Sequence, residues 1–338
     1  MSGASHARSE SARRAPREAY APAPGPAPGS VRRVLVVANL EKEGVPAVRE
    51  RMATWLRERV EKVHLEDDAR ELVRRRSTLD AEEAAAETPD LLIVLGGDGA
   101  ILGAVRAFAD HPVPTMGINF GRVGFLASVP ASRWEEALSG LLDGEGVIEP
   151  RMRLEARLAS PFGAPMRAVA MNDVVIERGA AQGMMTLGLH VGGNWVTDYR
   201  ADGLILATPS GSTAHSLSAG GPILFPSMGA LVVTPICPQG LSYRPIVLGS
   251  DSELDVVVKG SGGIVTLVID GQGLYPLRQG DSVRVTRHPV AWPLLAWASL
   301  DPYRRLRERL GWSGLVAPDA GPSQRGPRGP DDGHRGVL

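Results

Sequence analysis

The sequence contains a single cysteine, Cys237, among its 338 residues. One cysteine cannot form a disulfide within its own chain, so the sequence requires no oxidising compartment. Cys237 lies in the apolar stretch LVVTPICP, and we predict a buried thiol that packs as a small hydrophobic side chain. This cysteine content favours a cytoplasmic protein.

An excess of charge and a long apolar run are also absent. Lys and Arg together number 37 and Asp and Glu 38, which gives a formal net charge of -1. A nucleic-acid binder usually carries a basic excess instead. No apolar segment approaches the ~20 residues that a membrane-spanning helix needs. The sequence therefore predicts neither a nucleic-acid partner nor a membrane partner.

Both ends of the chain lack the apolar residues that a core needs. Residues 1–30 are rich in Ala, Pro, Ser and Arg, and residues 313–338 are rich in Gly and Pro. Such segments cannot bury enough apolar surface to offset the entropy of ordering, so we predict a disordered tail at each end. A transit peptide is the alternative for the Arg-rich start, but Glu10, Glu18 and the run APAPGPAPG interrupt an amphipathic helix.

From residue 31 to residue 148 the sequence alternates strand-like and helix-like segments. RVLVVA, LLIVLGG and VPTMGIN are apolar enough for buried strands. Residues 100–109 and 134–142 are helix candidates. After RVLVVA, apolar residues recur on one helical face: Val48, Met52, Trp55, Leu56 and Val60. Strands that alternate with helices indicate an α/β N-terminal domain whose mostly parallel sheet is covered on both faces.

From residue 149 to residue 298 short apolar runs follow one another, separated by Gly, Pro, Asp and Asn. AVAMNDVVIE, MMTLGLHV, ALVVTP and IVTLVID are examples. This spacing predicts an all-β C-terminal domain, β-sandwich-like, with sheet packed on sheet. Residues 299–312, which include DPYRRLRERL, predict a terminal helix that packs back on the first domain.

The turn Gly96-Gly97-Asp98-Gly99 follows the predicted strand LLIVL and precedes an apolar helix. Ligands of α/β sheets bind at the carboxyl ends of parallel strands, and glycines there bring backbone N–H groups close to phosphate oxygens. Asp98 would repel phosphate, so it indicates either a ligand of phosphate-bound Mg²⁺ or a base that accepts a hydroxyl proton. A plain Gly/Asp turn is the alternative. The motif is neither a Walker loop nor the dinucleotide fingerprint.

Two further polar stretches interrupt apolar runs. GINFGRVGFL, residues 117–126, is either a ligand-binding loop or an ordinary turn. Asn172 and Asp173 are poor strand formers, yet they stand inside AVAMNDVVIE. An adjacent amide and carboxylate can hydrogen-bond an adenine edge and a ribose diol. A turn or a strand start is the alternative for this pair.

The most specific stretch is DGLILATPSGSTAHSLSAGGPILFP, residues 202–226. After an apolar strand it places four hydroxyl groups within six positions, those of Thr208, Ser210, Ser212 and Thr213. One hydroxyl residue is enough to cap a helix that starts near Thr213. The surplus therefore predicts hydrogen bonds to a ligand.

Taken in order, these stretches resemble one family, the NAD kinases. GGDG, GINFGRVGFL, NDVVIERG, DGLILATPSGSTAHSLSAGGPIL, LSYRPIVL and IDGQG look like its ordered signature set, from about Val34 to Arg287. GGDG alone is shared with diacylglycerol-type lipid kinases and phosphofructokinases. The run over residues 202–226 is the part that resembles the NAD kinase branch specifically.

The resemblance implies an enzyme that transfers a phosphoryl group from ATP or polyphosphate to the adenosine ribose 2′-hydroxyl of NAD, giving NADP. It implies that Asp98 is the base or the residue that orients this hydroxyl, and that Gly96, Gly97 and Gly99 leave room for the donor phosphates. Mg²⁺ is implied to bind mostly through those phosphates, with Asp98 as the candidate protein ligand. The NAD-binding residues implied by motif position are Asp98, Gly99, Asn172, Asp173, Asp202, Thr213, Ala214, His215 and Ser218.

The family also implies a homodimer or homotetramer, in which a neighbouring subunit completes the site. Some positions depart from the family pattern: Ala100 stands where Thr is usual, His215 where Tyr is usual, and Gln239-Gly240 where His-Ser is usual. Two alternatives stay open. One is a catalytically weak NAD(P)-binding sensor of the same fold, and the other is a lipid kinase of the GGDG superfamily.

Overall fold

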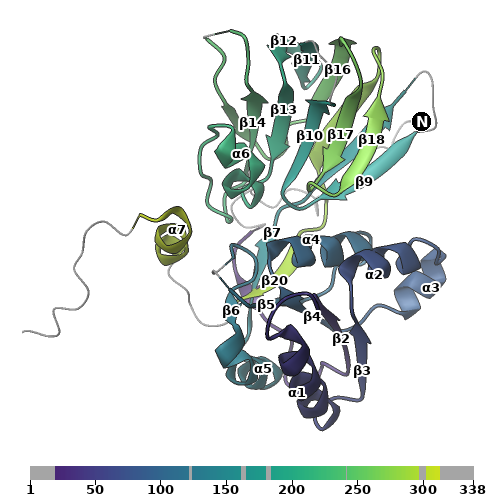
Figure 1. The fold of residues 1–338 in the computed structure, drawn as a ribbon, viewed down its shortest axis with the longest axis vertical. Helices are drawn as coiled ribbons and strands as arrows, with labels where there is room; N and C mark the ends of the chain where they lie inside the picture. The colour runs from purple at the N-terminus through teal and green to yellow at the C-terminus, as the bar shows by residue number, and fades with distance from the viewer. Residues whose placement is uncertain are drawn as a thin grey trace, which may run out of the picture.

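The computed structural model describes residues 20–121, 124–160, 165–179, 184–240, 242–296 and 302–312. These residues form an α/β unit and a β-rich unit that are stacked along the long axis of the molecule (Figure 1). The predicted tail over residues 313–338 and residues 1–19 of the other predicted tail lie outside the described residues.

An eight-stranded sheet forms the centre of the α/β unit, in the order β1-β7-β20-β5-β4-β2-β3 with β6 paired to β5. The pairs among β2 to β6, and that of β20 with β5, are parallel, whereas β7 is antiparallel to both its neighbours. This confirms the mostly parallel sheet. The strands are β1 (Ala23–Pro24), β2 (Arg33–Ala38), β3 (Lys62–Glu66), β4 (Leu91–Gly96), β5 (Thr115–Asn119), β6 (Val129–Pro130), β7 (Val147–Arg151) and β20 (Trp292–Ala296).

Helices cover both faces of this sheet, which explains why β4 is apolar throughout. Leu91, Ile93 and Leu95 pack on one side with α1 (Val45–Arg57) and α5 (Trp134–Leu142). Leu92 and Val94 pack on the other side with α2 (Ala69–Arg76) and α4 (Asp98–Ala107). The short α3 (Ala81–Ala86) lies beside α2, and α2 and α4 face the β-rich unit (Figure 1).

The β-rich unit consists of two six-stranded antiparallel sheets, in the orders β15-β14-β13-β10-β17-β18 and β12-β11-β16-β19-β8-β9. One buried apolar cluster takes residues from both sheets, such as Val174 of β10 and Val256 of β16, which confirms sheet packed on sheet. The strands are β8 (Leu154–Ala159), β9 (Met166–Ala170), β10 (Asp173–Arg178), β11 (Met185–Val191), β12 (Asn194–Ala201), β13 (Gly203–Ala207), β14 (Ala230–Ile236), β15 (Ile246–Gly249), β16 (Leu254–Gly260), β17 (Val265–Ile269), β18 (Gly273–Leu277) and β19 (Ser282–Arg287).

Three details differ from what the sequence predicted. The short β1 lies within residues 1–30, predicted as disordered, and pairs with β7. β20 lies within residues 149–298 but joins the sheet of the α/β unit, where the buried Trp292 ring donates Nε1–H to Thr115 Oγ1 at 3.1 Å. Cys237 is exposed rather than buried, because the chain leaves β14 there in a bend with φ of 44°.

The terminal helix α7 (Pro302–Leu310) contacts both units. The Tyr303 ring lies 5.3 Å from the Phe225 ring, in the β-rich half of the sequence. The Arg309 guanidinium lies 5.5 Å from the Phe125 ring, which belongs to the loop after β5. Its contacts therefore extend beyond the first domain, on which we expected it to pack.

Candidate active site

The GGDG turn ends the buried strand β4 and begins α4, with Gly97 as the N-cap residue and Asp98 as the first helical residue. The Asp98 carboxylate accepts the backbone N–H groups of Phe125 at 2.9 Å, Leu126 at 3.1 Å and Ala127 at 3.0 Å. The carboxylate therefore binds the GGDG turn to the end of the loop over residues 117–126. Two predicted motifs are brought together by this one side chain.

Gly124 makes this approach sterically possible. A Cβ atom at Gly124 would lie 2.1 Å from Asp98 Oδ1, far inside a normal contact. Asp98 Oδ1 accepts two of the three hydrogen bonds and Oδ2 accepts one. A carboxylate oxygen has about two acceptor positions, so Oδ2 keeps one for a ligand hydroxyl.

A second carboxylate, that of Asp270, organises the Asn172-Asp173 segment. Asp270 and Gly271 have φ of 49° and 66°, and Gln272 N–H donates to Ile269 O at 3.0 Å. This is the pattern of a type I′ turn, which Asp-Gly favours. The turn directs the Asp270 carboxylate at three backbone N–H groups: those of Met171 at 2.8 Å, Asn172 at 2.7 Å and Asp173 at 3.0 Å.

Asn172 and Asp173 are buried polar residues at the start of β10, with 9% and 4% of their surface exposed. Among the described residues, Asn172 Oδ1 has no hydrogen-bond partner. Leaving a buried acceptor unpaired costs roughly 1–3 kcal/mol, so this oxygen indicates a ligand that donates a hydrogen bond. Burial, with the nearby charges of Asp270 and Glu177, raises the pKa of Asp173 to about 7.

The hydroxyl residues after β13 pack against the Asn172 segment. Thr208 Oγ1 donates to Met171 O at 2.7 Å and accepts the Gly211 N–H at 3.1 Å. Gly211 lies so close that a Cβ atom there would be 2.0 Å from Asn172 O. Ser212 and Thr213 donate to the backbone carbonyls of Pro209 and Ser210. The sequence predicted that these extra hydroxyl groups bind a ligand. Several of them instead form hydrogen bonds that stabilise this loop.

A small, mostly apolar pocket of about 40 Å³ lies between the loop held by Asp98 and the loop after β13. Of the residues predicted to bind NAD, Thr213 lines this pocket. Ala214 is half-buried, and His215 and Ser218 of the short helix α6 (His215–Ser218) are exposed. Other residues of the wall are Phe125, Leu126, Pro209, Ser210, Leu224 and, from α7, Leu306.

A larger cavity of about 450 Å³ adjoins the other side of the GGDG turn, at the carboxyl ends of β2 and β3. Arg106 of α4 lines it, and Arg106 Nε is buried with no hydrogen-bond partner among the described residues. Gln272 also lines it and donates Nε2–H to Gly99 O at 3.0 Å. The polar wall includes Asn39, Glu41, Asp67, Asp68 and Arg70 as well.

Asp202 does not join these residues within one chain. It precedes β13, whereas Thr208 follows it, so the two are six residue steps apart along the strand, or about 20 Å at ~3.3 Å per residue. There Asp202 Oδ1 forms an ion pair with Arg178 Nε at 2.8 Å. The structure therefore places Asp202 at the opposite end of the sheet from Asn172.

Asp270, Gln272 and Arg106 were not predicted from the sequence to have a role in the site. The Asp-Gly pair in IDGQG carried a signal, because it is typical of a tight hairpin turn. Which backbone the Asp270 carboxylate would reach depends on a contact across 99 positions of sequence. Arg106 carried no signal, since Arg is common along this chain.

No group of three or more His, Cys, Asp or Glu residues in the described ranges could hold a metal ion. None of the described helices is both long enough and apolar enough to cross a membrane.

A Gly-rich turn at the carboxyl end of a parallel strand, with a polar cavity of about 450 Å³ beside it, is where α/β folds bind nucleotides and points to the class of nucleotide-dependent phosphotransferases. Family models agree with this class. Residues 34–146 match the ATP-NAD kinase N-terminal domain, and residues 171–295 match the ATP-NAD kinase C-terminal domain. The chain belongs to the NAD kinase family.

Individual relatives are similar over most of their length. The NAD kinase of Nitrosomonas europaea is 42% identical over 69% of this chain and 79% of its own. That of Pseudomonas putida is 37% identical over 83% of this chain and 96% of its own.

Two solved structures are also similar. Yeast NADH kinase complexed with NADH has a TM-score of 0.71 and 26% identity, over 86% of this chain and 90% of that one. An NAD kinase from Archaeoglobus fulgidus in complex with ATP has a TM-score of 0.65 and 25% identity, over 83% of this chain and 100% of that one.

Proposed function

We propose that this chain phosphorylates NAD with Asp98 placed between a donor in the large cavity and the adenosine half of NAD beside Asn172. NAD kinase activity as such follows from the family. The observation that carries the proposal is the Asp98 carboxylate, because its neighbour Gly99 lines the cavity while its partners Phe125 and Leu126 line the pocket.

The acceptor is recognised by the buried polar pair at the start of β10. Asn172 Oδ1 accepts a hydrogen bond from the adenine amino group, which supplies the partner that this oxygen lacks in the protein. The Asp173 carboxyl group binds ribose hydroxyls next to it. Thr213 and Ala214 form the apolar edge of this adenosine site, with His215 and Ser218 at its exposed rim.

Asp98 Oδ2 accepts the proton of the adenosine ribose 2′-hydroxyl. As that proton leaves, the 2′-oxygen forms a bond to the γ-phosphorus of the donor, and the bond from phosphorus to the leaving nucleoside diphosphate breaks. Three backbone hydrogen bonds hold the carboxylate in one orientation before reaction. Such prior alignment of the reacting groups is the main contribution that a protein makes to phosphoryl transfer.

The donor occupies the cavity of about 450 Å³. The guanidinium of Arg106 binds its phosphates, since the buried Nε has no protein partner. The carboxylates of Glu41, Asp67 and Asp68 in the same wall can accept hydrogen bonds from the hydroxyls of a nucleoside sugar. They would repel inorganic polyphosphate, which carries negative charge along its whole length. We therefore propose a nucleoside triphosphate donor, ATP, in preference to inorganic polyphosphate; the Archaeoglobus fulgidus relative was solved with ATP.

The family implies Mg²⁺, and the residues present fit a metal that is held mostly by the donor phosphates. Asp68 Oδ2 lies 3.1 Å from Arg70 Nη2, and Asp67 is paired with Arg49. Asp98 accepts three N–H groups, and its one remaining acceptor position is taken by the ribose hydroxyl. The described residues therefore leave Mg²⁺ few protein oxygens. When bound, Mg²⁺ neutralises charge on the phosphates.

Asp202 acts in a neighbouring subunit of a homodimer or homotetramer. This follows from its place some 20 Å along β13 from Thr208, estimated from strand rise, and from the family's multi-subunit site. We also infer a cytoplasmic location, which the single cysteine and its lack of an internal disulfide partner support.

The test is NADP formation by purified full-length protein with NAD, Mg²⁺ and either ATP or polyphosphate. We expect metal-dependent NADP formation with ATP and much slower formation with polyphosphate. Arg106→Gln should raise the KM for ATP about tenfold, the size of one lost charge-assisted hydrogen bond, and leave the Kd for NAD unchanged. The exposed Arg57 of α1 gives the control variant, Arg57→Gln. Equal activity with polyphosphate, or an unchanged KM for ATP in Arg106→Gln, would contradict the donor site.

A further inference from the structure

The chain passes between its two units at two neighbouring places. The first crossing joins β7 to β8 through Met152 and Arg153, and the second joins β19 to β20 through residues 288–291. The two crossings are hydrogen-bonded to each other, because His288 N–H donates to Arg153 O at 2.8 Å. Any rotation of one unit against the other has to deform this point.

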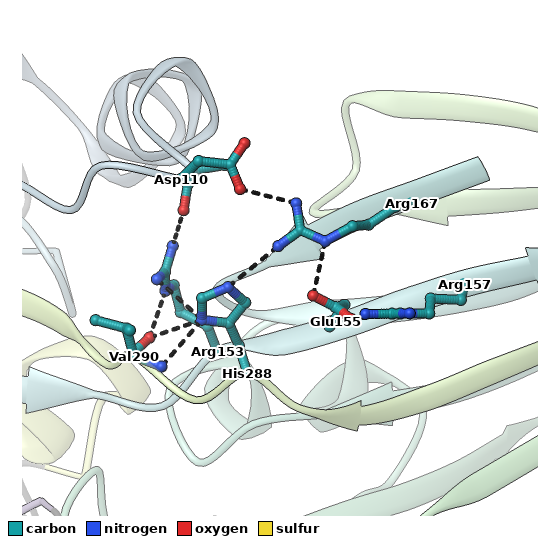
Figure 2. Close-up of polar contacts among 8 residues, drawn as sticks. Asp110, Arg153, Glu155, Arg157, Arg167, His288 and Val290 are labelled. Carbon is teal, nitrogen blue, oxygen red and sulfur yellow. Dashed lines mark hydrogen bonds and ion pairs between the residues drawn. The ribbon is translucent and has the colours of Figure 1, made fainter. Parts of the chain in front are cut away.

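Arg153 extends the connection to a third segment, the residues that follow α4. Its side chain has no exposed surface. The guanidinium lies between three groups. It donates to Ala109 O at 2.6 Å, and, as Figure 2 shows, it also donates to Val290 O, at 2.9 Å, and lies 3.1 Å from His288 Nδ1. One side chain thus binds both crossings and the segment that follows α4.

Arg167 of β9 makes a parallel connection at the surface. Its Nη1 donates to Asp110 at 2.8 Å, its Nε donates to Glu155 at 2.7 Å, and its Nη2 lies 3.4 Å from His288 Nε2 (Figure 2). Arg157 binds the other oxygen of Glu155 at 2.5 Å, and its hydrogen bonds among the described residues do not reach the segment after α4. The chain therefore contains a matched pair of arginines on one carboxylate, of which Arg167 reaches the segment after α4.

The opposite end of α4 begins with Asp98, and the β-rich unit holds it there too. Gln272 donates to Gly99 O at 3.0 Å. α4 is therefore bound by the β-rich unit at its first turn through Gln272 and beyond its last turn through Arg153 and Arg167. Asn172, the proposed acceptor-binding residue, belongs to that same β-rich unit.

We propose that Arg153 is a positioning residue for phosphoryl transfer, which fixes the direction of α4 against the β-rich unit and so aligns Asp98 with the acceptor held at Asn172. The inference rests on the proposed function. It predicts loss of turnover without comparable loss of acceptor binding, because Arg153 is bonded to the far end of α4 and to neither substrate.

Burying the charged guanidinium of Arg153 costs free energy of desolvation. Burial is the main cause that lowers the pKa of the Arg153 guanidinium to about 10, and a buried charge is retained only where its hydrogen bonds are well satisfied. Here two carbonyl oxygens and one imidazole nitrogen from two sequence-distant segments satisfy it.

The experiment compares wild type, Arg153→Met, Arg153→Lys and Arg157→Gln by kcat, by KM for both substrates and by the calorimetric Kd for NAD. A misalignment of about 1 Å can cost about 100-fold in rate. We expect Arg153→Met to lower kcat by about 10- to 100-fold with the Kd for NAD changed less than threefold. Arg153→Lys should recover part of kcat, and Arg157→Gln should match wild type.

An unchanged kcat in folded Arg153→Met, or a Kd for NAD that rises by the factor lost in kcat, would overturn the proposal. If Arg153→Met does not fold, Arg167→Gln against Arg157→Gln provides the same comparison at the surface, with the same two decisive outcomes. Wild-type protein that forms no NADP would refute the proposed function instead, so the two failures are distinguishable.

Discussion

Two aspartates shape the site in the same way. Asp98 and Asp270 each accept three consecutive backbone N–H groups from a segment far along the chain. The sequence indicated Asp98 as a functional residue, because a carboxylate in a Gly-rich turn would repel phosphate unless it binds a metal ion or accepts a proton. It gave no role to Asp270, because a strand followed by Asp-Gly predicts a turn but not the backbone that the carboxylate will bind.

The contact between Gly124 and Asp98 gives the first prediction. Gly124→Ala places a Cβ atom 2.1 Å from Asp98 Oδ1 and must displace the carboxylate. We expect a loss of stability of about 1–3 kcal/mol, as for an overpacked core, and a fall in kcat of at least about tenfold, since alignment of Asp98 is lost. Steady-state kinetics and denaturant unfolding check both values.

Gly121→Ala is the matched control for this prediction. It lies in the same loop, and a Cβ atom there would meet nothing within 4 Å. The Gly124 interpretation would be wrong if both variants lost kcat equally or if neither did.

Asn172 gives the second prediction at this scale. Its Oδ1 has no hydrogen-bond partner among the described residues, so Asn172→Ala removes an interaction with the ligand rather than with the protein. The KM for NAD should rise about tenfold, equivalent to ~1.4 kcal/mol. The midpoint temperature of thermal unfolding should change little. The exposed Asn194 supplies the control, Asn194→Ala. A large fall in the midpoint with an unchanged KM would show that Asn172 is structural.

Elements with a strong local pattern were predictable from the sequence. β4 and β5 were identified from continuous apolar runs, and α5 over residues 134–142 was predicted with the bounds that the structure shows. Residues 62–86 were left unassigned, although they form β3, α2 and α3. β3 is half-buried at an edge, and α3 has no buried residue, so neither shows the apolar periodicity on which prediction depends.

The crossing between β19 and β20 gives a pH prediction. Burial, and then the charge of Arg153, lowers the pKa of His288 from 6.5. The groups that face the ring are Arg153, Arg167 and Val290, with Glu155 and Asp110 behind Arg167. Because the unfolded state binds this proton more readily, the contribution of His288 to stability should be constant above about pH 6.5 and fall as the pH drops below it. The raised pKa of Asp173 contributes in the opposite sense over the same pH range, so the difference between wild type and a His288 variant isolates the His288 contribution.

Denaturant unfolding between pH 5 and 8 measures this dependence. Compared with wild type, His288→Gln should lose less stability as the pH falls below 6.5, because the titrating group is gone. The exposed His215 provides the control, and His215→Gln should keep the wild-type profile. An unaltered acid profile in His288→Gln would contradict the assignment.

The two-unit architecture was largely visible in the sequence, because the pattern changes from alternating strands and helices to short apolar runs near residue 150. The return of the chain to the first sheet was not visible. WPLLA of β20 has the composition of any buried strand, and its place between β5 and β7 depends on contacts with residues far earlier in the sequence. Local sequence therefore predicts which segments form strands better than it predicts which strands share a sheet.

Asp202 gives a prediction at the scale of the assembly. If Asp202 serves a neighbouring subunit, Asp98→Asn and Asp202→Ala chains should each be inactive alone. Co-expressed in equal amounts, they should form mixed dimers in which one site has both wild-type residues, giving roughly a quarter of wild-type activity for random pairing. Activity that stays at the level of the single variants would place Asp202 outside the neighbour's site.

The central claim is that Asp98 Oδ2 accepts the proton of the hydroxyl that is phosphorylated. Asp98→Asn tests it most directly, with kcat measured at saturating NAD and ATP and the Kd for NAD measured by calorimetry on the same preparation. The claim predicts that kcat falls about 100-fold or more, as for the loss of a general base, with the Kd for NAD within about threefold of wild type. A kcat that survives at saturating NAD, with the loss confined to NAD affinity, would contradict it and leave Asp98 a recognition residue.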